Sequence, residues 1–496
     1  MRLTDLLSAA SLPLAAPLAL AKADVEVSGL TLDSRQAMPG SLFAALPGNH
    51  ADGRDFIPQA LAQGAVAVLA KPGTRLPAGS TATLIPCHNP KHWLAILAGV
   101  FHAPQPRTVT CVTGTSGKTS VAHFARTLWE VIGMPAASLG TLGVFHSVES
   151  LPTSLTTPDS IAIHCALQKL QAKGIERAVL EASSHGLDQH RLDGLEIAAA
   201  AFTNLSHEHL DYHESMAAYF AAKVRLFTDL LRPDGLAVLN ADSPYYEQLT
   251  LIARERGQRI LSYGTDGAAD LRILERKAES RGQVLTLFVD GSKQRLQFPL
   301  IGDFQAMNAL AALGLVMGTG AAPAEALEAM TKLTPVPGRL EFVGSTATGG
   351  RVYIDYAHKP GALKAVLTTL RPYARKRLWL VIGCGGDRDR EKRPVMGCLA
   401  AKLADHGIVT DDNPRGEDPA EIRAAVLQGH PNLTEIGDRR QAIEAAVQAL
   451  KKSDLLVIAG KGHESGQTAG GKTTPFDDRV VAREAIAATK GQSSAA

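Results

Sequence analysis

A glycine-rich segment starting at Gly114 has the composition of a phosphate-binding loop. It follows a β-rich run at 108–113, precedes a helical pattern, and has the sequence Gly114-Thr115-Ser116-Gly117-Lys118-Thr119. Two glycines let backbone N–H groups approach phosphates, and the N-terminus of the following helix favours negative charge. Lys118 would pair with the β- and γ-phosphates, and the Thr119 hydroxyl would ligate Mg²⁺. Because Val112 stands where the general pattern has glycine, the segment predicts an NTP binder and leaves the acceptor open.

A second group of candidate residues follows two predicted strands further along the chain. Glu181 ends a strand predicted at 177–180, and His209 lies in the histidine-rich segment after a strand predicted at 197–203. Ligands of open α/β sheets bind at the carboxyl ends of the strands, where a carboxylate and an imidazole can share a hard cation that bridges phosphates. The phosphate loop favours Mg²⁺ over zinc. Lys223, in a following helical stretch, is on its own typical of a solvated helix residue.

The elements that must position these residues alternate between β-rich runs and helical stretches. Further strands are predicted at 66–69, 83–85, 108–113, 236–239, 352–355, 378–382, 407–410 and 455–458. This alternation predicts α/β domains whose mainly parallel sheets carry helices on both faces. Turn-rich linkers at 103–106 and 335–338 divide the chain. We expect a small N-terminal α/β domain over residues 1–106, a central phosphate-loop domain over 107–335 and a C-terminal doubly wound domain over 336–496.

Composition excludes several classes of protein. A formal net charge of +2 over 496 residues gives no electrostatic footprint for a nucleic-acid binder. The five cysteines are scattered and form no Cys-x-x-Cys pair, which is neither a disulfide framework nor a zinc signature. The apolar run at 6–21 is interrupted by prolines, so we expect a packed helix and strand there rather than a signal peptide or a membrane span. Residues after Lys490 are predicted to be a disordered tail.

Taken together, these motifs resemble those of the Mur ligases and the related folylpolyglutamate synthetases. Over nearly the whole chain they are similar to the branch that makes UDP-N-acetylmuramoyl-tripeptides. The resemblance implies that Thr119, Glu181 and His209 hold magnesium, and that Lys223 is carbamylated and helps to place a second metal ion. It also implies that ATP lies between the second and third domains. The ATP contacts it implies are Gly114, Thr115, Ser116, Gly117, Lys118, Thr119, Asn308, Arg339, Asp355 and His358, and Gln305 stands where the family usually has asparagine.

The same resemblance assigns the acceptor site. Ser34, Asn49, His50 and Ala51 fall where the family binds uridine, although without the resemblance these segments are equally typical of ordinary turns. The muramoyl-peptide contacts that the resemblance implies are Thr156, Thr157, Ser183, Gln189 and Arg191. Leu155 stands where asparagine is common, which puts that single contact in doubt.

The segment Asp412-Asn413-Pro414-Arg415 resembles the signature of the branch that adds meso-diaminopimelate. Diaminopimelate differs from lysine by a distal carboxylate, and the planar guanidinium of Arg415 suits a carboxylate. A site that left a buried arginine unpaired would reject lysine strongly. The resemblance completes the pocket with Arg388, Gly460 and Glu464, and Glu464 would meet the distal ammonium group.

These features imply an acid–amino-acid ligase of peptidoglycan precursor synthesis that depends on ATP and Mg²⁺. It would join meso-2,6-diaminopimelate to UDP-N-acetylmuramoyl-L-alanyl-D-glutamate through an acyl phosphate, with Lys118, Glu181, His209 and Lys223 as its catalytic residues. We expect a cytoplasmic monomer with no nucleic-acid partner and no stable membrane association. The alternatives are a lysine-adding relative, a folylpolyglutamate synthetase-like ligase and a non-catalytic nucleotide-binding homologue. The uridine-type segment and Arg415 disfavour the first two, and the complete catalytic set disfavours the third.

Overall fold

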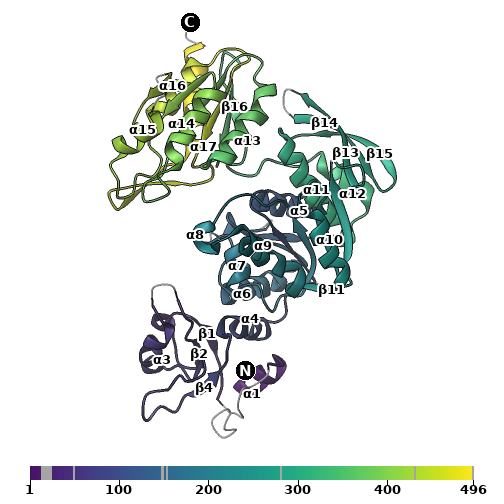
Figure 1. The fold of residues 1–496 in the computed structure, drawn as a ribbon, viewed down its shortest axis with the longest axis vertical. Helices are drawn as coiled ribbons and strands as arrows, with labels where there is room; N and C mark the ends of the chain where they lie inside the picture. Colours follow the sequence, from purple (N-terminus) through teal and green to yellow (C-terminus); the bar gives the residue numbers. More distant parts are fainter. Residues whose placement is uncertain are drawn as a thin grey trace. The chain divides into compact units, whose positions relative to one another are not determined.

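The computed structural model describes residues 1–12, 25–48, 51–146, 150–151, 155–279, 282–428, 430 and 432–493 (Figure 1). The chain forms two compact units. The first comprises Met1–Arg272, Val289–Gly291 and Asn308–Ala329, and the second comprises Ile273–Phe288, Ser292–Met307 and Met330–Ala496. None of the helices among the described residues combines the length and the apolar character that a membrane span needs.

The N-terminal part of the first unit is a parallel four-stranded sheet in the order β1-β2-β3-β4. Its elements are α1 (Leu3–Ala9), β1 (Gly29–Thr31), η1 (Ser34–Gln36), β2 (Ser41–Ala44), η2 (Gly53–Phe56), α3 (Ile57–Ala62), β3 (Ala67–Ala70), β4 (Thr83–Pro86) and α4 (Pro90–Phe101). Leu3 and Leu6 of α1 are fully buried in one core with α4, and Ile57 of α3 is buried in a second core. The small α/β domain and the packed N-terminal helix are therefore confirmed for the described residues, whereas residues 13–21 of the run in which a strand was also expected lie outside them.

The phosphate-loop segment belongs to an eleven-stranded sheet, in the order β15-β14-β13-β12-β11-β10-β5-β9-β6-β7-β8. Its strands are β5 (Thr108–Thr113), β6 (Ala136–Gly140), β7 (Gly143–His146), β8 (Ser150–Leu151), β9 (Arg177–Glu181), β10 (Ile197–Phe202), β11 (Leu231–Asn240), β12 (Arg259–Gly264), β13 (Leu271–Glu279), β14 (Gly282–Val289) and β15 (Ser292–Phe298). The helices are α5 (Lys118–Val131), α6 (Ser160–Ala172), α7 (Ser184–Asp188), α8 (Leu210–His213), α9 (Met216–Arg225), η3 (Leu226–Leu230), α10 (Tyr246–Glu255), α11 (Asp303–Gly318) and α12 (Pro323–Met330).

The pairing of these strands confirms the prediction of a mainly parallel sheet and refines it. Strands β6, β9, β5, β10, β11, β12 and β13 pair in parallel, whereas β7 pairs antiparallel with both β6 and β8. The antiparallel edge was not predicted, because strands of two to four residues carry too few alternating side chains to give a periodic signal. Strand β5 lies between β9 and β10, which brings the ends of all three together at one edge.

The C-terminal part of the second unit is a doubly wound sheet, as predicted. The order is β16-β17-β21-β18-β19-β20, and only β16 is antiparallel to its neighbour. Its elements are β16 (Glu341–Ser345), β17 (Arg351–Asp355), α13 (Pro360–Leu370), η4 (Arg371–Tyr373), β18 (Leu378–Ile382), α14 (Lys392–Leu403), β19 (His406–Val409), α15 (Pro419–Leu427), β20 (Leu433–Glu435), α16 (Arg439–Ala449), β21 (Leu455–Ala459), β22 (Gly466–Ala469), β23 (Lys472–Pro475) and α17 (Asp478–Ser493).

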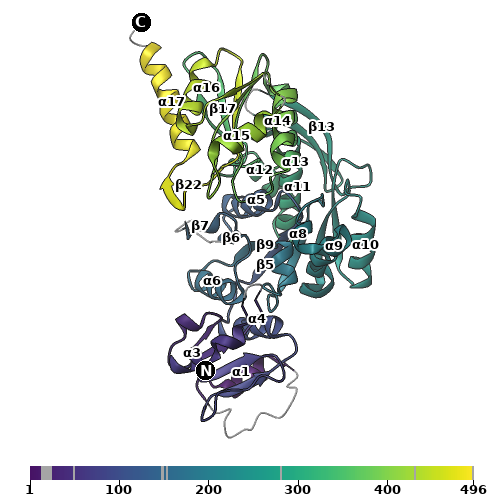
Figure 2. The same cartoon turned by 60° about the vertical axis from the view of Figure 1, so that its left-hand side comes forward.

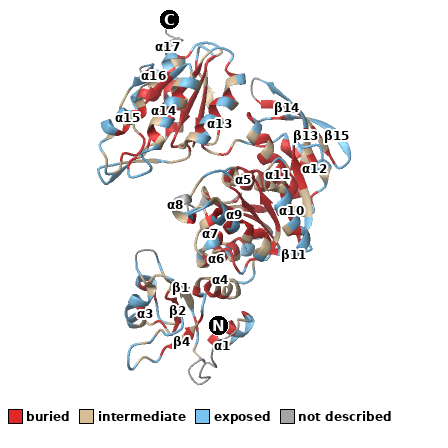
Figure 3. Ribbon diagram, in the orientation of Figure 1, coloured by how far each residue is buried: buried red, intermediate tan, exposed pale blue. Residues whose placement is uncertain are grey.

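Both faces of the inner strands of this sheet are buried, which explains why β18 and β21 are continuous apolar runs (Figure 3). Along β21, Leu455 and Val457 pack with α13–α15, while Leu456 and Ile458 pack with α16 and α17. Helices α16 and α17 lie side by side on that second face (Figure 2). Because α17 continues to Ser493, the prediction of a disordered tail after Lys490 is wrong for residues 491–493.

Candidate functional site

The phosphate loop joins β5 to α5, and its two glycines are required by their surroundings. Gly114 and Gly117 have φ of 146° and 92°. A Cβ on Gly114 would lie 1.9 Å from Oγ1 of Thr203, and one on Gly117 would lie 2.4 Å from Oδ1 of Asn308. Asn204, which the sequence did not single out, fixes the loop: its Oδ1 accepts from the Ser116 N–H at 2.9 Å. The conformation of the loop is therefore set by its glycines and by neighbouring residues that follow β10 or belong to α11.

Two lysine amines converge on a single carbonyl oxygen of this loop. Nζ of Lys118 and Nζ of Lys223 donate to the Gly114 carbonyl at 2.8 and 2.9 Å. Lys223 is only 1% exposed, and its amine lies 4.6 Å from the centroid of the Tyr219 ring. Burial, and then the charge of Lys118, hold the pKa of Lys223 well below its usual range. A neutral amine is the form that can react with CO₂, so the environment of Lys223 suits the predicted carbamate.

Glu181 is buried at the end of β9, where hydroxyl and amide groups surround its carboxylate. Oγ1 of Thr119 donates to Oε2 at 2.8 Å, and the N–H of Thr141 donates to Oε1 at 2.8 Å. A Cβ on Gly140 would lie 2.0 Å from Oε1, so only glycine leaves room for the carboxylate. A cavity of about 10 Å³ adjoins Thr119 and Glu181, which is room for about one water-sized species. These hard oxygen donors fit Mg²⁺.

His209 lies in a cluster of rings at the start of α8. Its φ is 55°, and its ring centroid lies 5.0 Å from that of His185 and 6.1 Å from that of Tyr219. The hydroxyl of Tyr219 lies 3.1 Å from that of Thr115 in the phosphate loop. Tyr219 therefore contacts the loop, Lys223 and His209 at once, although no sequence motif singles out a tyrosine on α9.

The predicted muramoyl-peptide residues form one hydrogen-bonded surface next to Glu181. Oγ1 of Thr157 donates to the Glu181 carbonyl at 2.7 Å, and Oγ1 of Thr156 lies 3.0 Å from that of Thr141. Nη1 of Arg191 donates to the Thr157 carbonyl at 2.5 Å.

Two further residues extend this surface. Gln189 accepts from Nη2 of Arg191 at 2.6 Å, and Oγ of Ser183 caps α7 by accepting from the Gly186 N–H at 3.1 Å. Hydroxyls and an arginine placed in this way suit an anionic sugar-peptide.

The predicted uridine residues belong to the N-terminal sheet. Ser34 is buried, and its hydroxyl donates to Oε1 of Gln59 at 2.8 Å. Ala51 is exposed, and Asn49 and His50 lie outside the described residues. The uridine contacts therefore stay a prediction.

Three of the predicted nucleotide residues surround Tyr356 in the second unit. The guanidinium carbon of Arg339 lies 4.4 Å from the Tyr356 ring centroid, and Nδ1 of His358 lies 2.8 Å from the Tyr356 carbonyl oxygen. Asp355 accepts from the N–H groups of Leu340 and Ala357, both at 2.8 Å. Burial raises the pKa of Asp355 and lowers that of His358.

The remaining residues of the ATP prediction have other neighbours. Asn308 belongs to the first unit, beside Gly117. Gln305, the departure from the family pattern, donates from Nε2 to the Arg339 carbonyl at 3.3 Å. Nζ of Lys392, which the sequence did not single out, donates to the His358 carbonyl at 3.0 Å.

The structure brings the predicted amino-acid residues together where β19 and β21 end. Nδ2 of Asn413 donates to Oε2 of Glu464 at 2.9 Å. Gly460 has φ of 114°, and a Cβ there would lie 2.6 Å from Oδ2 of Asp412.

The two predicted arginines of this pocket contact the loop after β18. Nη1 of Arg415 donates to the Gly386 carbonyl at 2.8 Å, and Nη1 of Arg388 donates to the Asp387 carbonyl at 3.2 Å. Arg388 is exposed, whereas Arg415 is half-buried. Two cations and two carboxylates thus lie around one edge of the sheet.

A separate group in the first unit has ligand atoms spaced for a metal ion. Nδ1 of His92 and Nδ1 of His190 lie 2.6 and 2.7 Å from Oδ2 of Asp193, which holds the pKa of that carboxyl at about 2 despite its burial. Nη2 of Arg225 lies 3.4 Å from the same oxygen. Because a guanidinium already neutralises the carboxylate, this group is a hydrogen-bonded junction and not a metal centre.

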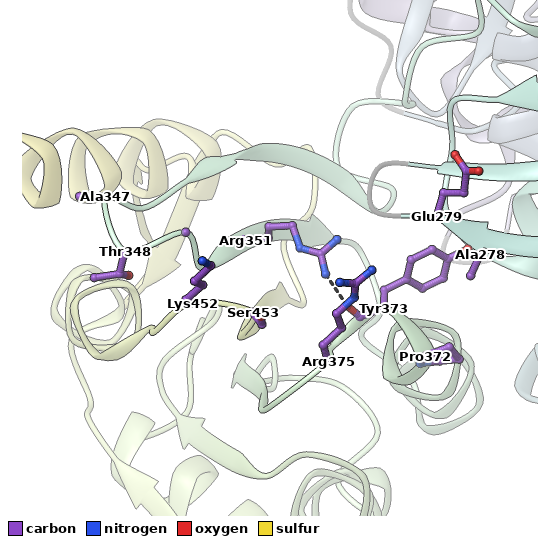
Figure 4. A pocket seen from close by; sticks show the side chains of 11 residues that line it. Ala278, Glu279, Ala347, Thr348, Arg351, Pro372, Tyr373, Arg375, Lys452 and Ser453 are labelled. Carbon is purple, nitrogen blue, oxygen red and sulfur yellow. Dashed lines mark hydrogen bonds between the residues drawn. The ribbon is translucent and has the colours of Figure 1, made fainter.

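A cavity of about 600 Å³ lies where strands β17 and β21 of the C-terminal sheet begin, whereas the predicted amino-acid residues follow the ends of the strands (Figure 4). Arg351 starts β17, and Ser453 precedes β21. The Arg351 guanidinium donates to the carbonyl of Tyr373. The exposed Arg375 and Lys452 complete its cationic lining. Strand amino ends are not where doubly wound sheets place their active sites.

Three family models match the chain in succession. The model of the Mur ligase family catalytic domain matches residues 26–102, that of the Mur ligase middle domain matches 112–316, and that of the Mur ligase glutamate ligase domain matches 338–462. Each match falls inside one of the three predicted domains.

Curated relatives match over almost the full length. The UDP-N-acetylmuramoyl-L-alanyl-D-glutamate–2,6-diaminopimelate ligase of Rhizobium meliloti is 46% identical over 487 residues, which cover 98% of this chain and 99% of that protein. The enzyme of the same name from Zymomonas mobilis is 46% identical over 467 residues, which cover 93% and 95%.

Solved structures agree with these matches. A structure of a UDP-N-acetylmuramoyl-L-alanyl-D-glutamate–2,6-diaminopimelate ligase has a TM-score of 0.71 and 34% identity, and covers 94% of this chain and 95% of that one. MurF from Thermotoga maritima in complex with ADP has a TM-score of 0.63 at 19% identity, with coverage of 94% and 98%, and indicates the fold alone.

Proposed function

This chain belongs to the Mur ligase family, and we propose that it is the ATP-dependent ligase that adds meso-2,6-diaminopimelate to UDP-N-acetylmuramoyl-L-alanyl-D-glutamate. The observation that carries this proposal is that a guanidinium and a carboxylate both lie in the loops that follow β19 and β21. Arg415 offers a guanidinium and Glu464 a carboxylate, which match the distal carboxylate and ammonium of diaminopimelate.

The phosphate-loop residues would activate the acceptor. The γ-phosphoryl group of ATP passes to the γ-carboxylate of the D-glutamate, so that a C–O–P linkage forms and ADP leaves. Lys118, which now donates to two loop carbonyls, turns to the phosphates and neutralises the charge that develops during transfer. Arg339, Asp355 and His358 would contact the nucleotide in this proposal.

Thr119, Glu181, His209 and a carbamylated Lys223 would hold Mg²⁺, which supplies charge neutralisation at the phosphates. The carboxylate and hydroxyl donors around Glu181 suit such an ion. The amine of diaminopimelate then attacks the acyl carbon, the C–N bond forms, a proton is lost from the amine, and inorganic phosphate leaves. Thr156, Thr157, Ser183, Gln189 and Arg191 would orient the acceptor so that its carboxylate meets the phosphoryl group.

The other parts of the proposal follow from the family. We propose that Ser34, Asn49, His50 and Ala51 contact the uridine and that the domains extend over residues 1–106, 107–335 and 336–496. We also propose that the enzyme acts as a monomer in the cytoplasm, in peptidoglycan precursor synthesis.

The test is formation of the UDP-muramoyl-tripeptide, followed by mass spectrometry together with phosphate release. We expect one phosphate per tripeptide with meso-diaminopimelate, a kcat/KM for L-lysine that is lower by at least about 1000-fold but still measurable, and a loss of at least about 100-fold in kcat/KM for Arg415→Ala. Turnover with lysine at a similar rate would replace the proposal by a lysine-adding ligase. ATP binding without turnover of either amino acid would contradict the ligase assignment itself.

A further inference from the structure

A lysine lies fully buried beneath the proposed amino-acid pocket. Lys461 follows β21 and is 0% exposed. Its Nζ donates to Oδ1 of Asn413 at 3.2 Å and lies 3.6 Å from Oε2 of Glu464 and 3.9 Å from Oδ1 of Asp412. One ammonium group therefore contacts three of the residues that the proposed function places around diaminopimelate.

Two carboxylates beside Lys461 favour the charged form of its amine. Burial lowers the pKa of this lysine, and Asp412 and Glu464 oppose that shift. Its other buried cationic neighbour, Arg439, is itself paired with Asp478 at 2.7 Å, and both of those side chains are 0% exposed. Nζ of Lys461 lies within 4 Å of two carboxylates, which favour the charged form of the amine.

The charged side chains around the proposed amino-acid pocket balance one another. Asp412 and Glu464 contribute two negative charges, and Lys461 and Arg415 contribute two positive charges. Arg388 is exposed, so water screens it. Without Lys461, the carboxylates of the buried Asp412 and the half-buried Glu464 would outnumber the guanidinium of Arg415, and the pocket would carry an excess negative charge.

Diaminopimelate and lysine, which would compete for this pocket, differ in the net charge of their distal centre. The distal centre of diaminopimelate carries a carboxylate and an ammonium group and is neutral overall, whereas that of lysine is an ammonium group alone. A pocket without excess charge favours the former, and a pocket with excess negative charge favours the latter.

We propose that Lys461 is a specificity-determining residue. Its buried charge offsets one of the two carboxylates and thereby makes the pocket prefer a distal centre with both charges over a bare ammonium group. This inference rests on the proposed function, because it concerns the choice between substrates of that reaction.

Lys461 also has a positioning contact that can be separated from its charge. Oδ1 of Asn413 accepts from Lys461 and from the Thr468 N–H at 2.9 Å, so its Nδ2 must face Glu464. Lys461→Met removes both the charge and this hydrogen bond. Lys461→Gln removes the charge and retains a donor near Asn413.

The test is the ratio of kcat/KM for meso-diaminopimelate to kcat/KM for L-lysine, measured by tripeptide formation with the full-length enzyme. We expect this ratio to fall at least about ten-fold in both Lys461→Met and Lys461→Gln. Lys472→Met, at an exposed lysine of β23 in the same part of the chain, should leave the ratio unchanged.

Each other outcome overturns the proposal. If both substrates lose activity equally, Lys461 is only structural, and if Lys461→Gln keeps the wild-type ratio, the hydrogen bond and not the charge matters. If neither Lys461 variant folds, as judged by the absence of a cooperative melting transition, Asp412→Asn is the substitute test. This variant removes a negative charge from the pocket, so it must raise the ratio of kcat/KM for diaminopimelate to that for lysine.

Wild-type enzyme that fails to add diaminopimelate would contradict the proposed function. Turnover by wild type with an unchanged ratio in the variants would contradict this inference alone.

Discussion

Lys223 and Lys461 are both buried, yet their surroundings assign them opposite chemistry. The amine of Lys223 meets a carbonyl, an aromatic ring and the nearby charge of Lys118, and its pKa is held well below the usual range. The amine of Lys461 meets two carboxylates that oppose the effect of burial. Burial alone therefore does not decide what a lysine does, because a neighbouring cation disfavours the charged form of a buried amine and neighbouring carboxylates favour it.

The largest effect is expected at the reactive member of this pair. Lys223→Met removes the amine that would become a carbamate, and we expect kcat to fall about 1000-fold, since a charged group at the phosphoryl site would be lost. Lys169→Met, at an exposed lysine of α6 in the same unit, is the matched control. Phosphate release measures both variants, and a Lys223→Met enzyme with near wild-type turnover would remove Lys223 from the catalytic residues.

A third buried cation, Arg439, differs from both lysines because it forms a fully buried ion pair with Asp478. Arg439 donates from Nε and Nη2 to Asp478, and from Nη2 to the Ala459 carbonyl at the end of β21. Arg439→Met leaves the Asp478 carboxylate buried and unpaired, so we expect the free energy of unfolding to fall by about 3–4 kcal/mol. Urea denaturation measures this change. A loss below about 1 kcal/mol would mean that the pair contributes little beyond packing, and the exposed Arg440→Met should lie within that limit.

A smaller effect is expected next to Glu181. Gly140→Ala places a methyl group where it would lie 2.0 Å from Oε1 of Glu181, so the carboxylate must move away from Thr119. We expect a loss of stability of about 2 kcal/mol and a higher Mg²⁺ concentration for half-maximal phosphate release. Gly29→Ala, in β1, is the matched control, because a Cβ there would meet nothing within 4 Å and its φ, like that of Gly140, is not positive. An unchanged Mg²⁺ requirement in Gly140→Ala would argue against Glu181 as a metal ligand.

The smallest effect is a dependence of stability on pH. Because the pKa of Lys223 is lower in the folded than in the unfolded protein, the unfolded chain binds more protons between those two values, and stability rises with pH across that window. In CO₂-free buffer, we compare the free energy of unfolding of the wild type with that of Lys223→Met. The difference should shift in favour of the wild type by up to about 1.4 kcal/mol per pH unit as the pH rises towards the pKa of lysine in the unfolded chain. A constant difference would show that the amine stays charged in the folded state.

The sequence predicted those parts of the molecule whose signal is local. The strands at 108–113 and 378–382 were predicted with their observed bounds, because long apolar runs between turns leave few alternatives. The phosphate loop was predicted from its composition, and its family assignment is confirmed. The prediction of a disordered tail is wrong for residues 491–493, although Val481 and Ile486 belong to a buried face of α17 that a helical period of apolar residues could have revealed.

The residues that were missed act through contacts that no local pattern records. Gly140 and Thr141 meet Glu181 because β6 and β9 are neighbours in the sheet, although about 40 residues of chain separate them. The helix around Lys223 has no feature that distinguishes a buried amine from a solvated one. Its role came from the family resemblance, and its burial became visible only once α9 was placed against the phosphate loop.

The most direct test of the contrast between the two lysines is ¹³C NMR of the enzyme equilibrated with ¹³C-labelled bicarbonate. A carbamate forms only on a neutral amine, so we predict one carbamate resonance that disappears in Lys223→Met and persists in Lys461→Met. Absence of the resonance in the wild type, or its loss in Lys461→Met alone, would contradict the assignment of a reactive amine to Lys223 and a fixed cation to Lys461.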